Sequence, residues 1–377
     1  MKQYKLLKGA IDMLIKAAVT NEKGKFEFEE IVLDEPKADE VLVKIVASGC
    51  CHTDLGGRDQ MAPWPIPGVL GHEGAGIVEK VGSMVQGIKP GDHVVLSYQH
   101  CGQCDNCIGG HPARCDTWFP LNFLGKLTDN TTRLHKKDGT DLSVFFGQSS
   151  FATYAVANQR QVAVVDPDVD LRLLGPLGCG FLTGFGSVVN VFKAGFGDTI
   201  AVFGVGGVGL AAIMAARIVG CQRIIAVGRH QAKLDLALEM GATDVVNSKE
   251  CDPVEAIRAI TGGRGVKYAF DTSGKAAIIK QAINASSAYA KICTVAMSPD
   301  TLEIAIEQEM MGPGRTILGS TEGDAVCKSF IPKMVDYYKQ GRFPFDKLCK
   351  FYKFEEIEQA FQDSLDGKVV KPIVVME

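Results

Sequence analysis

The sequence predicts an α/β protein of two domains, a β-rich domain and a domain built on a doubly wound parallel sheet. The chain has 377 residues, which is longer than one hydrophobic core usually supports, and 46% of them are hydrophobic. The first half holds short strand-like runs such as 40–46 and 93–96, separated by Gly, Pro and Asp. From about Thr199, apolar runs alternate with helical patterns, which is typical of parallel βαβ units.

The parallel sheet begins with residues 199–203, a continuous apolar run of the kind that is buried on both faces of a sheet. A glycine turn and a helical stretch to Val219 follow. Further strands are expected at 223–227, 244–246, 268–271, 292–295 and 316–318. Six parallel strands with helices between them form a complete Rossmann dinucleotide-binding sheet.

The C-terminal segment 354–377 has the pattern of an amphipathic helix followed by a strand. A six-stranded sheet has no neat place for this strand, so we expect the segment to return to the first domain. The predicted domains are therefore 1–180 with 324–377, and 181–323. The polar, irregular stretch 118–148 is expected to be a long surface loop.

Composition excludes several classes of function. Charged residues make up 22% of the chain, the net charge is -4, and no basic stripe points to nucleic acid. The N-terminus lacks the apolar region of a signal peptide, and no apolar run reaches the length of a transmembrane helix. We therefore expect a cytoplasmic protein with a small-molecule substrate and neither a nucleic-acid nor a membrane partner.

Cysteines supply the most specific motif. Cys101, Cys104, Cys107 and Cys115 have the spacing C-x2-C-x2-C-x7-C, and four such thiolates can surround one structural Zn²⁺ with no open position. A disulfide cluster or an iron–sulfur centre is the alternative, but nothing in the sequence suggests export. Six further cysteines have no motif around them and are expected to be small buried hydrophobes: Cys50, Cys221, Cys251, Cys293, Cys327 and Cys349.

A glycine motif follows the first strand of the parallel sheet and precedes a helix. It consists of Gly204, Val205, Gly206, Gly207, Val208 and Gly209, which is G-x-G-x-x-G. Gly204 allows the tight turn, Gly206 lets the backbone approach a pyrophosphate, and Gly209 lets the helix pack on the strand. The pyrophosphate then lies at the positive end of the helix. A tight turn in another α/β fold is the alternative.

The end of the second strand indicates which dinucleotide is bound. NAD sites usually have Asp or Glu there to hold the ribose hydroxyls, but this strand ends in Gly228. Arg229 offers a planar donor fork for a 2′-phosphate, His230 adds another donor, and Lys233 lies three residues further on. The sequence favours NADP(H) over NAD(H). The alternative is a solvated Arg229 with NAD held through backbone groups.

A second metal site is suggested by three distant segments, 49–54, 71–76 and 178–184. Cys51, His72 and Cys179 together would give two thiolates and one imidazole, a ligand set that leaves one zinc position open for chemistry. A buried cysteine and a hydrogen-bonded core histidine are the alternatives, and spacing alone does not decide between them.

The motifs together resemble those of the zinc-dependent medium-chain alcohol dehydrogenases. Within that family they are most similar to bacterial aryl- and benzyl-alcohol dehydrogenases. The matching stretches run over nearly the whole chain: C-H-T-D at 51–54, G-H-E-G-A-G at 71–76, G-D-H-V at 91–94, the four-cysteine lobe at about 97–117, G-C-G-F-L-T-G at 178–184, G-V-G-G-V-G at 204–209 and G-K-V-V-K at 367–371. The resemblance implies a GroES-like catalytic domain with a Rossmann coenzyme domain inserted before the C-terminal segment.

The resemblance also implies roles for residues of the catalytic domain. Cys51, His72 and Cys179 resemble the catalytic zinc ligands, and Glu73 resembles an acidic residue that can approach the metal. Asp54 resembles the carboxylate that orients the ligand histidine. Thr53 resembles the hydroxyl that takes the substrate proton, while zinc acts as a Lewis acid on the substrate oxygen.

For the cofactor, the resemblance places His52 and Lys371 at the pyrophosphate and Thr183 beside the nicotinamide, and Val295 is a further expected contact. The implied activity is reversible hydride transfer between NADP and a primary alcohol, with two zinc ions per subunit. A homodimer or homotetramer is expected, because pairing of the edge strand 316–318 across a two-fold axis would cover an open sheet edge.

The chain departs from the family pattern at Gly56, at Gly228 and at Lys371. Gly56 stands where many members have a histidine, so water is expected beyond Thr53, and Lys371 stands where an arginine is common. Trp64 and Phe123 are expected to line an apolar pocket, and the stretch 145–154 resembles that of the aryl- and benzyl-alcohol enzymes, which favours an aromatic or allylic alcohol. A broad aliphatic alcohol dehydrogenase that uses NAD and a non-catalytic dinucleotide-binding protein are the alternatives.

Overall fold

A computed structural model describes residues 4–7 and 10–376 of the chain. It divides the chain into two compact units. The first unit runs to Cys179 and takes up the chain again at Val326–Lys339 and from Phe345 onward, and the second comprises Gly180–Ala325 and Gln340–Pro344. No helix among the described residues is long and apolar enough to cross a membrane.

The first unit contains two mixed sheets. One has the strand order β8-β3-β2-β5-β9, with β1 paired to β2, and the other has the order β11-β7-β6-β4-β19-β18, with β10 paired to β4. The first sheet consists of β1 Tyr4–Leu7, β2 Ala10–Thr20, β3 Glu27–Leu33, β5 Gly68–Val69, β8 Leu134–His135 and β9 Ser143–Val144. The second consists of β4 Glu40–Gly49, β6 Gly74–Val81, β7 His93–Leu96, β10 Tyr154–Asn158, β11 Val162–Val164, β18 Cys349–Lys353 and β19 Lys371–Val375.

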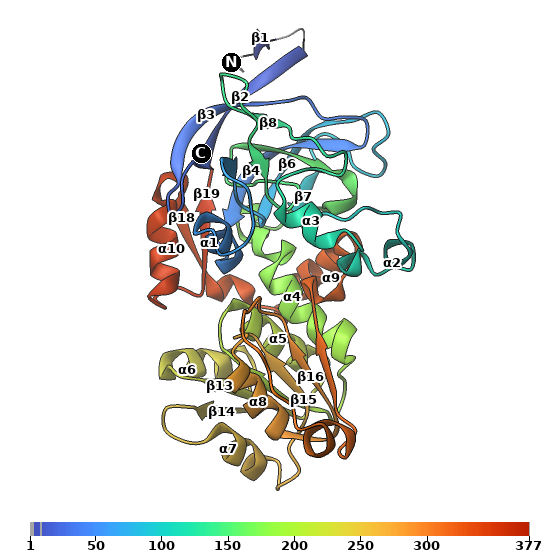
Figure 1. The fold of residues 1–377 in the computed structure, drawn as a ribbon, viewed down its shortest axis with the longest axis vertical. Helices are drawn as coiled ribbons and strands as arrows, with labels where there is room; N and C mark the ends of the chain where they lie inside the picture. Colours follow the sequence, from blue (N-terminus) through green and yellow to red (C-terminus); the bar gives the residue numbers. More distant parts are fainter. Residues whose placement is uncertain (1–3, 8–9, 377) are drawn as a thin grey trace. The chain divides into compact units, whose positions relative to one another are not determined.

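The C-terminal strand completes the second of these sheets. Strand β19 pairs antiparallel with β4, with Ile373 opposite Gly49, and Figure 1 shows the two strands side by side. Its residues Ile373 and Val374 are fully buried, which is why this short apolar run is held inside the sheet. The same pairing brings Lys371, the first residue of β19, toward the segments that carry Cys51 and Glu73.

The helices of the first unit range from 4 to 13 residues. They are α1 His52–Arg58, α2 Asp105–Ile108, α3 Trp118–Phe123, α9 Cys327–Lys339 and α10 Ile357–Leu365. The expected surface loop 118–148 is a partly wrong prediction, because it contains α3, β8 and β9. The stretch also buries Phe123 at the end of α3, and Leu142 beside Phe145 near its own end, so much of it belongs to the core.

The second unit is a Rossmann domain, as predicted. Its six strands have the order β14-β13-β12-β15-β16-β17 and pair in parallel throughout, which is the 3-2-1-4-5-6 order of this fold. The strands are β12 Thr199–Phe203, β13 Arg223–Gly228, β14 Asp244–Asn247, β15 Val266–Asp271, β16 Ser286–Thr294 and β17 Thr316–Gly319. The helices are α4 Gly180–Gly186, α5 Gly207–Ile218, α6 Gln231–Met240, α7 Pro253–Ile260 and α8 Ala276–Asn284.

Burial explains why the central strands were readable from the sequence. Ile200, Ala201 and Val202 of β12 have no exposed surface, and Ile225 and Ala226 of β13 beside them are equally buried. Strands covered on both faces are continuous apolar runs, and each of them was predicted at or near its place.

Candidate catalytic metal site

Four potential metal ligands of the first unit converge from distant parts of the chain. Cys51, His72, Glu73 and Cys179 each offer one donor atom, and these atoms lie within 4.8 Å of one another. Cys51 directly precedes α1, His72 and Glu73 lie between β5 and β6, and Cys179 ends a short 3₁₀ helix at Gly175–Gly178. The three residues of the predicted ligand set, Cys51, His72 and Cys179, are thus brought together.

The imidazole of His72 is oriented by Asp54. His72 Nδ1 lies 2.8 Å from Asp54 Oδ1, and both side chains are fully buried. With Nδ1 engaged by the carboxylate, Nε2 is the donor left for a metal, and this buried nitrogen has no hydrogen-bond partner among the described residues. A buried polar atom without a partner is costly, so a zinc ion between His72 and the two thiols fits this donor set.

Asp54 also fixes the backbone on both sides of the site. The main-chain N–H of Cys51 donates to Asp54 Oδ2 at 3.0 Å, and that of Gly71 donates to Oδ1 at 3.1 Å. Asp54 lies in the first turn of α1, where a carboxylate is favoured by the helix dipole. One side chain therefore connects the segments that carry Cys51 and His72.

The surroundings of Cys51 favour its thiolate form. A hydrogen bond from Cys179 lowers the pKa of the Cys51 thiol well below its usual value, and the charges of Lys371 and His72 lower it further against the effect of burial. Zinc binds thiolate, so this environment suits metal ligation.

Glu73 forms a buried ion pair with Lys371. The Lys371 ammonium lies 2.9 Å from both carboxylate oxygens, and its side chain is 6% exposed. A Cβ at Gly49 would lie 2.0 Å from Glu73 Oε2, and a Cβ at Gly175 would lie 2.1 Å from the Glu73 carbonyl oxygen, so glycine is needed at both places. Lys371 was expected at the cofactor's pyrophosphate; in this structure it is buried against Glu73 and the carbonyl of Cys50.

The residues of the expected proton route lie at the start of α1. Thr53 Oγ1 is 3.7 Å from Cys51 Sγ, which places the hydroxyl beside the metal ligands. His52 is exposed at the first position of the helix. Gly56 is buried, and a Cβ added there would meet only the Cβ of Ala62, at 4.0 Å.

An aromatic cluster surrounds the imidazole of His72. The ring of Phe146 lies 4.7 Å from it at a tilt of 32°, and that of Phe145 lies 5.4 Å away edge-on. Trp64 and Phe123, which were expected to line a substrate pocket, pack against Phe145 instead and are each 1% exposed. These two rings act here as core that supports the site.

The four-cysteine cluster has the geometry of a closed zinc site. Its four sulfurs lie within 4.8 Å of one another, with Cys101 Sγ 3.9 Å from Cys107 Sγ and Cys104 Sγ 4.0 Å from Cys115 Sγ. A tetrahedron with Zn–S bonds of about 2.3 Å has edges of about 3.8 Å, whereas a disulfide needs about 2.05 Å. None of the twelve cysteines, all of which lie among the described residues, forms a disulfide.

Backbone donors in the same lobe stabilise thiolate. The N–H groups of Gln103 and Cys104 donate to Cys101 Sγ at 3.4 Å, and the N–H of Cys101 donates to Cys115 Sγ at 3.3 Å. Burial raises the pKa of the Cys101 thiol, but the N–H groups of Gln103 and Cys104, together with the neighbouring thiols, lower it to about 6. Among the other cysteines, Cys50, Cys293 and Cys327 are buried as expected, Cys221 and Cys349 are half-buried, and Cys251 is exposed, which corrects the expectation for that residue.

The glycine motif of the second unit has the predicted strand–turn–helix setting. Gly204 follows β12 with φ +105°, a conformation that favours glycine. A Cβ at Gly209 would lie 1.9 Å from the carbonyl oxygen of Gly204, so glycine is required for α5 to pack this close. Space within 4 Å of a Cβ at Gly206 is open, which leaves room for a ligand group at the N-terminus of α5, the helix that Gly207 and Val208 begin.

Of the side chains expected at a 2′-phosphate, Arg229 and His230 directly follow β13, and Lys233 lies in the first turn of α6. Arg229 and His230 are exposed and Lys233 is half-buried, and no hydrogen bond or ion pair engages the Arg229 side chain within the described residues. Gly228 ends β13 and is buried, and a Cβ there would lie 2.8 Å from Val205 Cγ2. Of the other expected cofactor contacts, Thr183 lies in α4 and Val295 follows β16.

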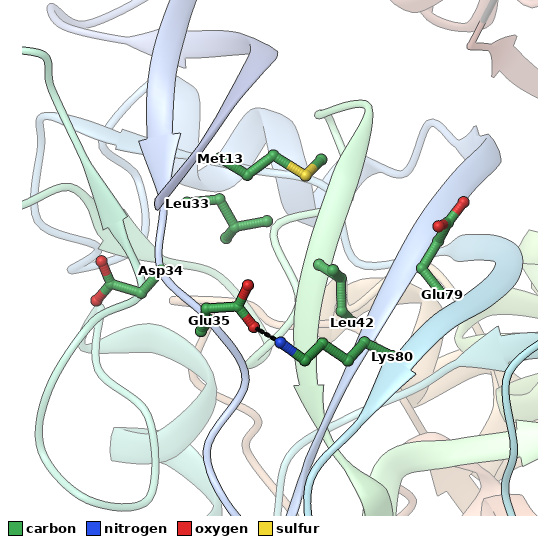
Figure 2. A pocket seen from close by; sticks show the side chains of 7 residues that line it. All are labelled: Met13, Leu33, Asp34, Glu35, Leu42, Glu79 and Lys80. Carbon is green, nitrogen blue, oxygen red and sulfur yellow. Dashed lines mark hydrogen bonds and ion pairs between the residues drawn. The ribbon is translucent and has the colours of Figure 1, made fainter. Parts of the chain in front are cut away.

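A separate cavity of about 130 Å³ lies between β2, β3, β4 and β6. Figure 2 shows its apolar side chains, Met13, Leu33 and Leu42, and its charged rim, where Lys80 forms an ion pair with Glu35. None of the metal ligands lines it, so this cavity is no part of the candidate site.

Sequence reasoning missed one residue beside the site, Gln148. Its carboxamide donates to the carbonyl oxygens of His72 and Ser97, both at 2.9 Å, and accepts from the N–H of Gly74 at 3.1 Å. A hydrogen bond between a side chain and a backbone carbonyl 76 positions away produces no periodic pattern in the sequence, so it could not be predicted. The only available signal was the stretch 145–154, which resembled that of the aryl- and benzyl-alcohol enzymes.

Comparisons with known proteins agree with this geometry. The family described as "Alcohol dehydrogenase GroES-like domain" matches residues 37–167, and the family described as "Zinc-binding dehydrogenase" matches residues 207–339. The chain is 42% identical to the geraniol dehydrogenase of Castellaniella defragrans over 355 residues, which cover 93% of this chain and 95% of that protein.

Solved structures give the same assignment. The benzyl alcohol dehydrogenase of Acinetobacter calcoaceticus superposes with a TM-score of 0.93 at 45% identity, over 97% of this chain and 99% of that one. An alcohol dehydrogenase zinc-binding domain protein from Burkholderia ambifaria superposes with a TM-score of 0.94 at 47% identity, over 97% and 100% of the two chains. The chain therefore belongs to the zinc-dependent medium-chain alcohol dehydrogenases.

Proposed function

We propose that the protein catalyses reversible hydride transfer between NADP(H) and a primary aromatic or allylic alcohol, at a zinc ion held by Cys51, His72 and Cys179. The observation that carries this proposal is the convergence of these three donors, with His72 Nε2 buried and unpartnered among the described residues. When bound, zinc supplies a Lewis acid for the substrate oxygen, and the nicotinamide supplies or accepts the hydride.

The chain's own residues hold this site and move the proton. Asp54 keeps the proton on His72 Nδ1, so that Nε2 presents its lone pair to the metal. Thr53 Oγ1, 3.7 Å from Cys51 Sγ, is placed to accept the proton of the alcohol and pass it to water. Glu73 could act as a fourth ligand, since its carboxylate oxygen lies in the same cluster. Its ion pair with Lys371 competes with metal binding.

The second metal site, at Cys101, Cys104, Cys107 and Cys115, would take a structural zinc ion, giving two zinc ions per subunit. Four thiolates leave no position for a substrate, so its contribution is to folding.

The relatives support the substrate class. Geraniol and benzyl alcohol, which give two of the similar proteins their names, are both primary alcohols whose reacting carbon is next to an unsaturated carbon. In both alcohols a π-system lies next to the carbon that loses hydride, and this shared feature defines the aromatic and allylic class. We propose the same class for this chain.

The residues at the end of β13 support NADP(H). Gly228 has no carboxylate to repel a 2′-phosphate, and Arg229 is exposed and unengaged by any described residue. A charge-assisted contact is worth about 1.5–3 kcal/mol, and about 1.4 kcal/mol is tenfold in affinity. We therefore expect at least about tenfold higher kcat/KM with NADPH than with NADH.

One experiment tests both substrate and cofactor. The rate of NADPH or NADH oxidation is measured with benzaldehyde and with butanal, for the unmodified protein and for Arg229→Ala. Preference for benzaldehyde and for NADPH, with the latter lost in Arg229→Ala, is the expected result. Equal rates with NADH, or an NADH preference in the unmodified protein, would leave a broad NAD-dependent alcohol dehydrogenase as the better description.

Arg229→Ala is a cleaner variant than restoring an acidic residue at Gly228. A Cβ at Gly228 would lie 2.8 Å from Val205 Cγ2 and 3.1 Å from Leu234 Cδ2, so Gly228→Asp must displace core side chains. Its effect on cofactor choice would be mixed with a loss of stability.

A further inference from the structure

The segment Phe145–Phe151, here called the clamp, runs beside the backbone that carries His72. Ser149 Oγ donates to the carbonyl of Val69 at 2.7 Å, Phe151 N–H to Leu70 at 3.1 Å and Ser150 N–H to Gly71 at 3.0 Å. Gln148 continues this series with its side chain. Its Nε2 donates to the carbonyl of His72 at 2.9 Å, and its Oε1 accepts from the N–H of Gly74 at 3.1 Å.

Three residues of the clamp have a backbone conformation that residues with side chains rarely adopt. Phe146, Gly147 and Ser149 have φ values of +51°, +61° and +50°. The left-handed region is unfavourable for residues with a side chain, so two such residues within four positions persist only where their surroundings determine them. Gln161 helps to hold this left-handed backbone, because its Nε2 donates to the carbonyls of Phe146 and Gly147 at 3.0 and 3.2 Å.

Gln148 also connects to the segment that carries Cys179. Its Nε2 donates to the carbonyl of Ser97 at 2.9 Å, and Ser97 Oγ donates to the carbonyl of Gly178 at 2.7 Å. Gly178 directly precedes Cys179. Gln148, which is 2% exposed, therefore contacts the His72 segment directly and the Cys179 segment by way of Ser97.

We propose that Gln148 is a positioning residue that fixes the backbones of His72 and Cys179 and so retains the catalytic zinc. The inference rests on the proposed function, because it assumes that these two residues ligate the metal. Asp54 orients the imidazole from its side chain, whereas Gln148 holds the main chain from which the imidazole extends. The two act on different parts of the same ligand.

Gln148→Met tests the proposal, because methionine fills a similar volume and neither donates nor accepts these bonds. The matched control is Gln99→Met. Gln99 is a second buried glutamine, 1% exposed, whose Nε2 donates to the carbonyls of Leu121 and Lys126 at 2.8 and 3.3 Å. Its side chain makes no hydrogen bond to His72 or Gly74 within the described part of the chain.

Zinc release to a chromophoric chelator is followed in both variants, in the unmodified protein and in His72→Ala. The phase missing in His72→Ala marks the catalytic ion. We expect Gln148→Met to speed that phase about 10- to 100-fold, the usual range for groups that orient ligands, and to leave the other phase unchanged. Gln99→Met should leave the catalytic phase at its original rate.

A Co²⁺-substituted sample adds a readout that general destabilisation does not move. The visible bands of the catalytic ion should shift in Gln148→Met, and those of the four-cysteine site should not. If Gln148→Met does not fold, Gln148→Glu serves instead, because it keeps the acceptor for Gly74 and loses the donors for His72 and Ser97.

Unchanged release from Gln148→Met, or equal acceleration in Gln99→Met, would overturn the positioning role while leaving the proposed function in place. A release curve of the unmodified protein that His72→Ala does not alter would overturn the proposed function itself, and the positioning role with it.

Discussion

His72 Nδ1 and Asp54 Oδ1 lie 2.8 Å apart, and neither side chain has any exposed surface. The contact settles which imidazole nitrogen remains for a metal, and the same carboxylate also accepts from the backbone of Cys51 and of Gly71. Geometry at the proposed catalytic zinc therefore depends on Asp54 although it is not a ligand.

Replacement of Asp54 should weaken zinc binding selectively. In Asp54→Asn the NH2 group of the new side chain must face either His72 Nδ1–H or the N–H of Cys51. In both cases one of the two acceptor oxygens is lost. We expect about 10- to 100-fold lower affinity for the catalytic zinc, measured by competition with a chelator. Asp59→Asn, at the end of the same helix and paired with Arg58, is the control and should retain both ions.

The four-cysteine lobe should contribute stability instead of chemistry. Cys104→Ser removes one of four thiolates, and the loss of metal-linked folding energy should lower the free energy of unfolding by about 3 kcal/mol and the unfolding midpoint by about 10 °C. Scanning calorimetry measures this. Cys251→Ser, at an exposed cysteine outside both clusters, should leave the midpoint unchanged. A Cys104→Ser midpoint equal to that of Cys251→Ser would speak against a structural ion.

Much of the fold was readable from the sequence because its signals are local. Strands buried on both faces, such as 199–203, are continuous apolar runs, and the cysteines at 101–115 lie within one lobe. The stretch 118–148 was misread because its polar composition hides two buried rings, Phe123 at the end of the short helix α3 and Phe145 just after β9. Gln148 was missed because its partners are backbone atoms far away in the chain.

The proposed catalytic ligand set was predicted from motif resemblance and not from a local pattern. Cys51, His72 and Cys179 come from segments whose approach depends on the completed sheets, so their spacing carries no information about distance. Motif resemblance selected them, and the structure brings their donor atoms together. The Glu73–Lys371 pair followed from neither, because it depends on β19 reaching the edge of β4.

A histidine at position 56 should add a proton-transfer group that Gly56 does not provide. The first atom of a new side chain at Gly56 has room, with its nearest neighbour at 4.0 Å. Gly56→His should raise turnover near neutral pH, with a new inflection near about pH 6.5 in the pH–rate profile. Gly56→Ala separates packing from proton transfer. Identical profiles for both variants would mean that proton release through Thr53 and water is not limiting.

The Rossmann sheet should form an intersubunit contact. Strand β17 is an edge strand, which pairs only with β16 among the described residues, and exposed edges tend to be covered. We expect a homodimer or homotetramer, so light scattering at micromolar concentration should give a mass of at least twice 40.5 kDa. A monomeric mass under these conditions would contradict this prediction.

We propose that Cys51, His72 and Cys179 hold a zinc ion that the reaction requires, in addition to the ion of the four-cysteine lobe. Metal analysis combined with turnover, on the freshly purified protein and on His72→Ala, tests this proposal most directly. We expect two zinc ions per chain in the unmodified protein. In His72→Ala we expect one zinc ion, with aldehyde reduction lost and the unfolding midpoint nearly retained. One zinc ion or none in the unmodified protein, or full turnover in His72→Ala, would show that this zinc site is wrong.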